Sequence, residues 1–446
     1  MNMVKAVTQS DKPPYAVPSM EDIRAIPWNG FTVASTFSGC GGSSTGYRMA
    51  GFKVLWASEF IDAARDSYKA NAAPHTIVDG RDIRQVTPQD FLDATGLKVG
   101  ELDLFDGSPP CASFSTAGKR EAGWGKVKKY SDKAQRTDDL FHEFIRMVDG
   151  IRPKVFVAEN VSGLVKGTAK GYFLEILAAM KAIGYRVTCK VLDAQWLGVP
   201  QARQRTIFVG VREDLGLAPV HPKPLPYRYS VRDALPWIER VIHDTSGQFG
   251  AGDVTNRPSP AITVGVNSVN SLHFKVKGRE HIIACGGNGA FGEEKWQSPD
   301  LPARTIGASP TTGNGLSGGG DVIVAKVEAE TDISRYAIGR EWDKMGKPGT
   351  QSKKYFQLVR PDLDAPCGTI TGSGGDGSIA GITHPTEKRK FSIAELKRIC
   401  GFPDDFILTG TYAQQWERCG RAVPPVMMSH IAITVRDQIL KKLSSE

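Results

Sequence analysis

The chain has 446 residues, 40% of them hydrophobic and 23% charged, with a formal net charge of +8. This composition is ordinary for a soluble globular protein, and the length allows a catalytic core and a second lobe. No apolar run approaches the roughly 18 residues of a membrane span, and the first twenty residues lack the apolar stretch of a signal peptide. The basic balance suits a polyanionic partner such as nucleic acid, although composition alone is a weak signal for one.

The cysteines indicate a reducing compartment. They are odd in number, widely scattered, and show no close pairing of the kind that zinc sites and redox couples use. We therefore expect reduced thiols, no metal site and a cytoplasmic location. The seven are Cys40, Cys111, Cys189, Cys285, Cys367, Cys400 and Cys419.

From Phe31 to about Arg212, short β-branched or aromatic runs alternate with helical patterns, which predicts βαβ units. Most runs are almost continuously apolar, as in a parallel sheet covered on both faces. We therefore expect an α/β fold with a doubly wound sheet, with helices at Asp139–Val148 and Tyr172–Ile183. The predicted strands are Thr32–Phe37, Lys53–Ser58, Thr76–Val78, Leu102–Phe105, Lys154–Ala158, Arg186–Leu192 and Thr206–Val211.

Beyond Pro219, and as far as about Thr386, Gly, Pro, Ser, Thr and Asn separate short strand-like pieces, which predicts a second, smaller, loop-rich lobe. Within it, Pro-x-x-Thr followed by Ile or Val occurs three times. These segments are either strand-and-turn units packed side by side or turns that present backbone groups and hydroxyls to a groove. They are Pro260–Val264, Pro302–Ile306 and Pro366–Ile370.

Helical periodicity resumes at Ser392–Cys400, where Ser392 and Glu395 form a capping-box pattern, and again at Val426–Lys442. The chain is therefore expected to return to its first lobe. The predicted organisation is an N-terminal extension (1–30), a first lobe (31–218), a second lobe (219–386) and a C-terminal segment (387–446).

The first predicted strand leads into Phe37-Ser-Gly-Cys-Gly-Gly42 and then into a helical stretch. Glycines at such a turn let the backbone approach a nucleotide closely, although the spacing departs from GxGxxG and a structural turn is an equal interpretation. Glu59 and Asp82 follow the next two strands, at the edge where open α/β sheets bind ligands. A carboxylate there can accept ribose hydroxyls or an exocyclic amine, or it can simply be a solvated loop acid.

The segment Asp106-Gly-Ser-Pro-Pro-Cys-Ala-Ser-Phe-Ser115 follows the fourth strand. Its two prolines stiffen the turn and place Cys111 at the carboxyl edge of the sheet, where a thiol can face a cleft. Without neighbours, a buried structural cysteine would be the simpler interpretation.

Two further motifs bring acid and base groups to the same edge. Glu159 lies in a Glu-Asn-Val segment after the fifth strand, where Asn160 can fix the turn. Arg203 and Arg205 directly precede the last strand and are expected to point to one side. Thiol, carboxylate and guanidinium could then converge on one planar heterocycle.

In their order and spacing, these segments resemble the motifs of the cytosine-5 DNA methyltransferase family, of bacterial or phage type. The similarity runs from Phe37 to about Met428 and includes Gly401-Phe-Pro-Asp404 and Gly420-Arg-Ala-Val-Pro-Pro425. The resemblance implies a Rossmann-like core that uses S-adenosylmethionine. It also implies that 219–386, which lacks a matching motif, is the target recognition domain.

The chemistry of cytosine explains why these residue types occur together. Carbon 5 is a poor nucleophile until a thiolate, here Cys111, adds to carbon 6, and a nearby arginine would favour that thiolate. Glu159 can share a proton with ring nitrogen 3 and so select cytosine. The resemblance further implies that Arg205 holds the ring carbonyl oxygen and that Arg203 supports the pocket.

The resemblance also implies which residues contact the donor and which contact double-stranded DNA. We expect the protein to bind DNA as a monomer, in the cytoplasm of a bacterial cell or a phage-infected host. The target base must leave the duplex, and the basic stretch after Cys111 suits a mobile loop that closes over phosphates, with a solvated charge run as the alternative. Expected DNA contacts are Ser115, Lys119, Arg120, Lys126 and Lys128. Expected donor contacts are Phe37, Ser38, Gly39, Gly41, Gly42, Glu59, Phe60, Asp82, Ile83, Pro109, Leu140, Arg421, Ala422 and Val423.

Two positions depart from the family pattern. Ala112 stands where the family usually has Gln, which removes one polar contact. Arg421 stands where the family usually has Asn, near the amino-acid end of the donor. Either Arg421 pairs with an anionic donor, carboxy-S-adenosylmethionine, to give 5-carboxymethylcytosine, or it pairs with a local acid while ordinary S-adenosylmethionine binds.

Three other functions are weaker. A tRNA cytosine-5 methyltransferase branch resembles the chain in every catalytic motif but has a reduced recognition region, whereas about 170 residues lie there in this chain. A catalytically silent DNA-binding module would not need the intact motifs. An oxidoreductase would leave Cys111, Glu159 and the arginines without a role.

Overall fold

The computed structural model describes residues 12–110, 139–165, 170–238 and 331–444, and the backbone of four short strands at 128–130, 133–135, 280–281 and 325–326. It divides into two compact units, Met1–Pro236 with Ile333–Glu446, and Trp237–Asp332. Described strands of the second unit are β10 (Glu280–His281) and β11 (Ala325–Lys326), which pair antiparallel. The recognition lobe at 219–386 stays a prediction.

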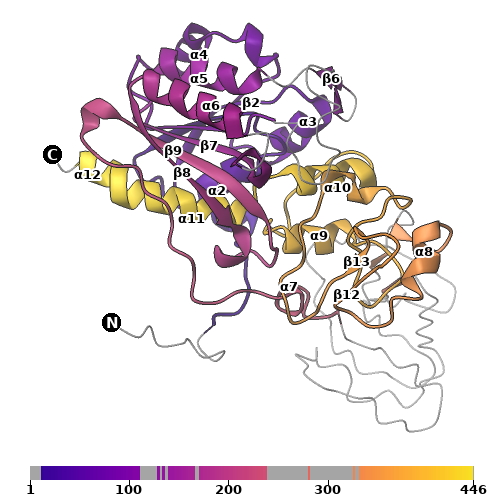
Figure 1. Cartoon of the computed structure of the whole chain (residues 1–446). Helices are drawn as coiled ribbons and strands as arrows, with labels where there is room; N and C mark the ends of the chain where they lie inside the picture. Colours follow the sequence, from indigo (N-terminus) through magenta and orange to yellow (C-terminus); the bar gives the residue numbers. More distant parts are fainter. Residues whose placement is uncertain are drawn as a thin grey trace, which may run out of the picture. The chain divides into compact units, whose positions relative to one another are not determined.

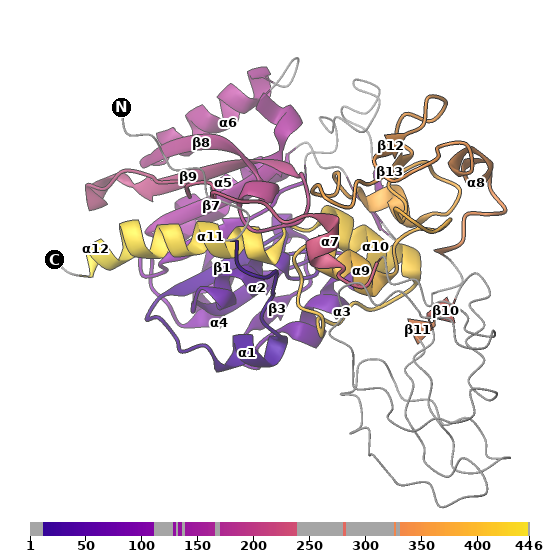
Figure 2. The same cartoon turned by 90° about the horizontal axis from the view of Figure 1, so that it is seen from below.

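A seven-stranded sheet forms the centre of the first unit (Figures 1 and 2), in the order β3-β2-β1-β4-β7-β9-β8. Each predicted strand is present, within three residues of its predicted ends. The strands are β1 (Thr32–Thr36), β2 (Lys53–Ser58), β3 (Ile77–Asp79), β4 (Leu104–Gly107), β7 (Val155–Val161), β8 (Tyr185–Asp193) and β9 (Gln204–Arg212).

The prediction of a parallel sheet is wrong for β9, which runs antiparallel to both β7 and β8. The connection from β8 to β9 contains one 3₁₀ turn, Ala194–Trp196, and no crossover helix. A short connection of this kind returns the chain beside the strand it has just left, which produces an antiparallel pair. Strand β9 therefore lies between β7 and β8, which the helical crossover α6 had already joined.

Helices cover both faces of this sheet. Successive strand residues alternate between two apolar clusters, so that Val33 and Leu104 belong to one and Ala34 and Phe105 to the other. The first cluster includes residues of α2 and α11, and the second residues of α4, α5 and α6 (Figure 1). This two-sided burial explains why the strands have continuous apolar sequences.

The helices predicted at 139–148 and 172–183 are confirmed as α5 and α6. The predicted capping box is present, with Ser392 Oγ accepting from the Glu395 amide at the start of α9. The helices of the first unit are α1 (Met20–Ala25), α2 (Gly42–Met49), α3 (Asp62–Asn71), α4 (Pro88–Thr95), α5 (Leu140–Ile151), α6 (Lys170–Ala182), α7 (Val231–Ala234), α8 (Ala337–Trp342), α9 (Ile393–Ile399), α10 (Tyr412–Arg421), α11 (Pro425–Val435) and α12 (Lys441–Leu443), with a π-helical turn at Arg436–Leu440 between the last two.

Two short strand pairs lie outside the central sheet in the described part of the first unit. The antiparallel pairs of the first unit are β5 (Lys128–Tyr130) with β6 (Lys133–Gln135) and β12 (Thr350–Gln351) with β13 (Val359–Arg360). Across the described part of the chain, no helix has the length and apolar character needed to cross a membrane.

Helix α11 packs directly against α2, although some 380 residues separate them in sequence. Gly46 makes this approach possible. A Cβ atom at Gly46 would lie 2.5 Å from the Pro425 carbonyl oxygen and 2.6 Å from Met428 Cβ, which is closer than van der Waals contact allows. The C-terminal helix therefore forms part of the core around β1 and α2.

Candidate active site

The glycine-rich turn between β1 and α2 packs against the turn that follows α10. A Cβ atom at Gly42 would lie 2.3 Å from the Val423 carbonyl oxygen and 3.3 Å from Ala422 Cβ. Gly41 has φ 100°, where only glycine is unstrained, and it caps α2. The structure thus brings together two of the segments predicted to hold the donor.

This turn leaves room for a ligand beside the backbone. Gly39 has φ 55°, and a Cβ atom there would meet no atom within 4 Å. Phe37 also has a positive φ, 52°, which is strained for a residue with a side chain. Ser38 supports the turn by donating its hydroxyl to the Ser35 carbonyl at 2.9 Å. The tight path and the open space beside Gly39 fit close approach by a nucleotide.

Glu59 lies directly beneath the turn. Its side chain accepts hydrogen bonds from the Gly39 and Ile61 amides, each at 2.7 Å. Burial raises the pKa of Glu59, while these two amides act in the opposite direction. A carboxylate has about four acceptor positions, so the remaining ones can accept ribose hydroxyls.

Asp82 follows β3 and caps the short turn Ile83–Gln85. It accepts from the Arg84 amide at 3.1 Å and pairs with the Arg84 guanidinium at 3.0 Å. Arg84 also pairs with Asp139, at 2.6 Å, at the start of α5. Ile83 and the adjacent Leu140 are buried in the core, with 4% and 0% of their surfaces exposed. Asp82 is therefore held by an ion-pair network rather than being a solvated loop acid.

Asp106 at the end of β4 is also buried and polar. It accepts hydroxyl hydrogen bonds from Ser35 at 2.8 Å and Tyr47 at 3.1 Å. Burial raises its pKa to about 7, and the negative charge of Glu159 acts in the same direction.

Asn160 fixes the turn that leads to the predicted nucleophile. Its side-chain amide donates to the Pro109 carbonyl at 3.1 Å, and its side-chain oxygen accepts from the Val161 amide at 2.8 Å. The end of β7 is thereby bonded to the chain two residues before Cys111. Cys111 itself lies outside the described residues.

Glu159 and Arg205 form a buried ion pair on the same side of the sheet. Strand pairing sets Glu159 opposite Ile207, so Arg205 is its diagonal neighbour two residues along β9. Arg205 Nε lies 2.6 Å from Glu159 Oε1, and the two side chains are 13% and 10% exposed. Burial lowers the pKa of Arg205, and Glu159 opposes this effect.

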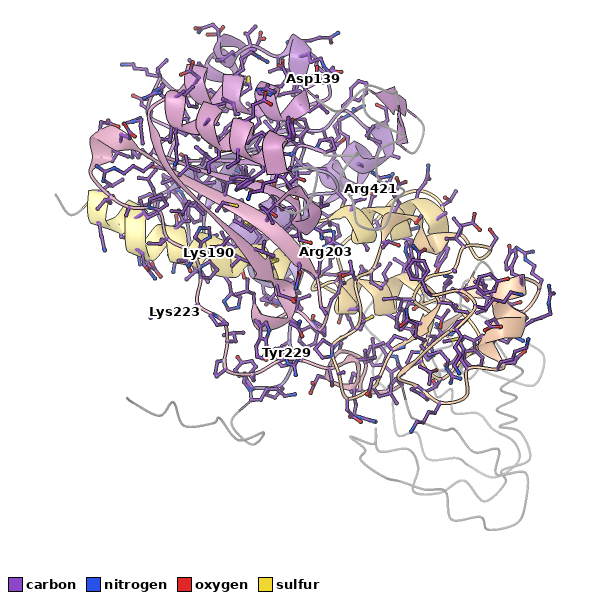
Figure 3. All side chains as sticks on the ribbon, in the orientation of Figure 1. Asp139, Lys190, Arg203, Lys223, Tyr229 and Arg421 are labelled. Atoms are coloured by element: carbon purple, nitrogen blue, oxygen red, sulfur yellow. The ribbon has the colours of Figure 1, made fainter. Side chains whose placement is uncertain are left out.

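Arg203, which is labelled in Figure 3, is buried, with 1% of its surface exposed. Its Nη1 donates to the Ile370 carbonyl at 3.0 Å, while Nε and Nη2 have no hydrogen-bond partner among the described residues. Burial, and then the positive charge of Arg205, lower its pKa, and Glu159 acts in the opposite direction. Glu159 and Arg205 are thus brought together, whereas Arg203 precedes the strand and bonds to a different segment. The predicted convergence with the Cys111 thiol stays a prediction, because Cys111 lies outside the described residues.

The predicted DNA contacts all fall outside the residues whose side chains the structure describes. Ser115, Lys119, Arg120 and Lys126 lie in the segment left undescribed, and only the backbone of Lys128 is placed, in β5. In the described part of the chain, no group of three or more His, Cys, Asp or Glu residues is arranged to hold a metal ion.

Arg421 pairs with an acid of its own helix. Its Nη2 lies 2.8 Å from Glu417 Oε1, one turn earlier in α10, and its side chain is 49% exposed. Glu417 is thus the local acid required by the interpretation in which Arg421 does not pair with the donor.

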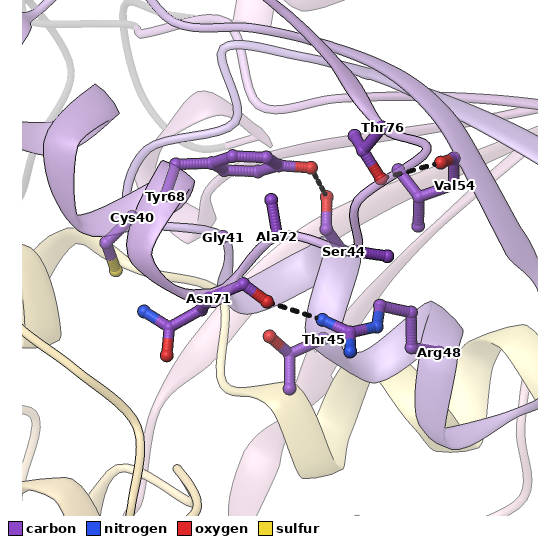
Figure 4. Close-up of a pocket in the computed structure, with 11 residues that line it drawn as sticks. Cys40, Gly41, Ser44, Thr45, Arg48, Val54, Tyr68, Asn71, Ala72 and Thr76 are labelled. Carbon is purple, nitrogen blue, oxygen red and sulfur yellow. Dashed lines mark hydrogen bonds between the residues drawn. The ribbon is translucent and has the colours of Figure 1, made fainter. Parts of the chain in front are cut away.

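A small pocket of about 220 Å³ lies on the α2–α3 side of Gly41 (Figure 4). Hydrogen bonds cross it from Tyr68 to Ser44 at 2.9 Å and from Arg48 to the Asn71 carbonyl at 2.7 Å. It is smaller than ordinary ligand sites, and its polar groups bond to one another.

Two contributors to the site were not predicted. In the sequence, Asp106 stands out only as the first residue of the segment that contains Cys111, with no sign of its burial. The Ile370 carbonyl belongs to the third Pro-x-x-Thr segment, whose repetition was the available signal. That segment forms an isolated bridge, Cys367 with Gln201, and does not form a strand unit. The first two repeats lie outside the described residues.

A solved structure shares the fold of this chain. A candidate DNA modification methyltransferase encoded within an E. coli prophage has a similar structure, with a TM-score of 0.58 and 19% identity, over 94% of this chain and 100% of that one. The predicted methyltransferase-type α/β fold is confirmed.

The family follows from sequence comparison. The family described as C-5 cytosine-specific DNA methylase matches residues 31–436, and the chain belongs to it. Similar curated proteins include the Type II methyltransferase M.NgoFVII of Neisseria gonorrhoeae, 28% identical over 90% of this chain and 86% of that protein. Another is M.MthTI of Methanothermobacter thermautotrophicus, which is 27% identical over 91% of this chain and 97% of that protein. The protein is a DNA cytosine methyltransferase, as the motifs predicted.

Proposed function

We propose that the protein methylates carbon 5 of a flipped-out cytosine in a specific duplex DNA sequence, through a temporary bond between Cys111 and carbon 6. The observation that carries this proposal is the buried Glu159–Arg205 ion pair, with its 2.6 Å Nε–Oε1 distance. Glu159 lies on β7, and the next residue, Asn160, donates to the carbonyl of Pro109, two residues before the nucleophile. An acid, a guanidinium and the approach to a thiol thus share one edge of the sheet.

The residues divide the chemistry between them. The Cys111 thiolate forms a bond to carbon 6, and the electron pair of the ring double bond becomes available at carbon 5. As charge builds at ring nitrogen 3, the proton shared with Glu159 moves to that nitrogen. Arg205 then stabilises the carboxylate that remains, and its other guanidinium nitrogens can hold the ring carbonyl oxygen. Carbon 5 would take the methyl group as the bond to the donor sulfur breaks and a neutral thioether leaves. Loss of the carbon 5 proton to a base or water, with return of the nitrogen 3 proton to Glu159, then restores the double bond and releases the thiolate.

The donor proposed is S-adenosylmethionine, which supplies an electrophilic methyl group on a sulfonium. The residues present fit it: the backbone at Gly39 faces open space, and Glu59 has acceptor positions beneath it. Asp82 follows the next strand, where an acid can accept the adenine amine. The Arg421–Glu417 pair supports the ordinary donor over the carboxylated one, because the guanidinium already has an anionic partner.

The target proposed is duplex DNA, recognised by residues 219–386. The similar Type II methyltransferases support a restriction-modification setting. Their likeness extends over about 90% of this chain, which includes the proposed recognition region.

The Cys111→Ser variant tests the covalent pathway. Wild-type protein incubated with donor and DNA containing 5-fluorocytosine should form an adduct that survives denaturation, because fluorine cannot leave as a proton does. Cys111→Ser should form none, whereas Cys189→Ser, which changes a partly exposed thiol on β8, should trap DNA normally. Methyl transfer by Cys111→Ser at the wild-type rate would refute the pathway.

A further inference from the structure

The segment 366–375, called the strap below, is hydrogen-bonded along the loop that carries Arg203. The Ala202 amide donates to the Cys367 carbonyl at 2.7 Å, and the Cys367 amide donates to the Pro200 carbonyl at 3.0 Å. Thr369 then donates its hydroxyl to the Ala202 carbonyl at 2.7 Å. The strap therefore binds this loop through both backbone and side chain.

The same strap also packs against α10, which leads to the donor turn. Trp416 Nε1 donates to the Thr371 carbonyl at 2.9 Å. A Cβ atom at Gly420 would lie 2.5 Å from the Thr371 carbonyl carbon, and one at Gly374 would lie 2.7 Å from Trp416 Nε1. The ten residues of the strap therefore contact both the loop that carries Arg203 and helix α10, which ends at Arg421.

Arg203 depends on the strap for its position. The Ile370 carbonyl accepts from its Nη1 at 3.0 Å, and its Nε and Nη2 have no partner among the described residues. Arg205 follows two residues later and bonds to Glu159 at 2.6 Å. A displacement of the loop would therefore shift the Arg203 guanidinium relative to this ion pair. Misplacement of a catalytic group by about 1 Å can cost as much as about 100-fold in rate.

We propose that the strap is a positioning element for methyl transfer and that Thr369 is its key positioning residue. The Thr369 hydroxyl fixes the Ala202 carbonyl, which sets the backbone from which Arg203 projects, two residues before Arg205. The proposal rests on the function proposed above. It gives the third Pro-x-x-Thr segment a role in aligning the site.

Thr369→Val removes the hydroxyl and keeps the shape of the side chain, and Thr369→Ser restores the hydroxyl. The matched control is Thr95→Val, which removes a hydroxyl bond of 2.8 Å to the Phe91 carbonyl in α4. We expect Thr369→Val to lower kcat about three- to tenfold, the range set by one hydrogen bond. KM for DNA and for the donor should stay within about twofold, and Thr369→Ser and Thr95→Val should keep at least about half of the wild-type kcat.

Hydrogen exchange provides a measurement that does not depend on activity. In Thr369→Val, the Ala202 and Cys367 amides should exchange faster than in wild type, while exchange elsewhere in the sheet is unchanged. Unchanged exchange at these two amides would overturn the proposal, whatever the activity of the wild-type protein. A wild-type protein that transferred no methyl group would instead refute the proposed function. A raised KM for DNA with unchanged kcat would also overturn it, because Thr369 would then contact substrate directly.

Discussion

Replacing Glu159 by Gln keeps the shape of the side chain but removes the charge that pairs with Arg205 and the ability to exchange a proton with the base. The Gln carbonyl can still accept from Arg205, and its amide can still donate to ring nitrogen 3. The amide cannot transfer that proton as charge builds in the ring. We therefore expect the flipped cytosine to bind and the reaction to slow.

The structure allows the loss of stability and the loss of rate in Glu159→Gln to be compared. The Arg205–Glu159 contact of 2.6 Å is largely buried, with side chains 13% and 10% exposed, so the charge-assisted bond should contribute about 1.5–3 kcal/mol to stability. Positioned proton transfer contributes about 10²- to 10⁴-fold in rate. The fall in kcat should therefore exceed what partial unfolding explains, while KM for DNA changes little.

Single-turnover methyl transfer and urea unfolding of the same preparations measure the two effects. The control is Glu143→Gln, which breaks an ion pair of similar length, 2.8 Å to Arg146, on α5. That variant should methylate DNA within about twofold of wild type, because its ion pair is half-buried, lies within a single helix and contributes only a few tenths of a kcal/mol. A Glu159→Gln protein that is folded and as fast as wild type would refute the assignment of Glu159 to proton sharing.

Two further predictions concern Asp106 and Arg421. Burial raises the pKa of Asp106 from 3.8 to about 7, so between those pH values the native state binds more protons than the unfolded state and stability falls as pH rises. This difference corresponds to about 4 kcal/mol at most. Asp106→Asn should remove that pH dependence in unfolding experiments from pH 4 to 8, and an unchanged slope would contradict it. Arg421→Ala should cost less than about 0.5 kcal/mol, because its bond to Glu417 is an exposed pair one helical turn apart. Mass analysis should find 5-methylcytosine with S-adenosylmethionine and no modified base with carboxy-S-adenosylmethionine alone, and 5-carboxymethylcytosine would refute the ordinary donor.

The sequence predicted the strands well because most of them are buried on both faces. Strands such as β4 and β7 have few exposed positions, so their apolar runs mark them clearly. The direction of β9 was not predictable in the same way. It depends on whether the chain after β8 crosses over or turns back, and the turn at Ala194–Trp196 has no strong local signal.

The predicted site was found in part. Glu159 and Arg205 meet because the antiparallel register of β7 and β9 makes them diagonal neighbours, and their motifs already placed both at one edge of the predicted sheet. The partner of Arg203 was missed because Ile370 is 167 residues away in sequence, and no periodicity reports contacts at that separation. Burial of Asp106 was missed for the same reason, since its polar partners lie on β1 and α2.

The contact between Gly46 and helix α11 has a consequence for protein synthesis. The N-terminal part of a chain leaves the ribosome first, yet the surface of α2 around Gly46 is completed only by Pro425 and Met428. Almost the whole polypeptide must therefore be made before this half of the sheet is covered. Prematurely terminated products would expose an apolar face, and we expect them to be degraded before they can reach the chromosome.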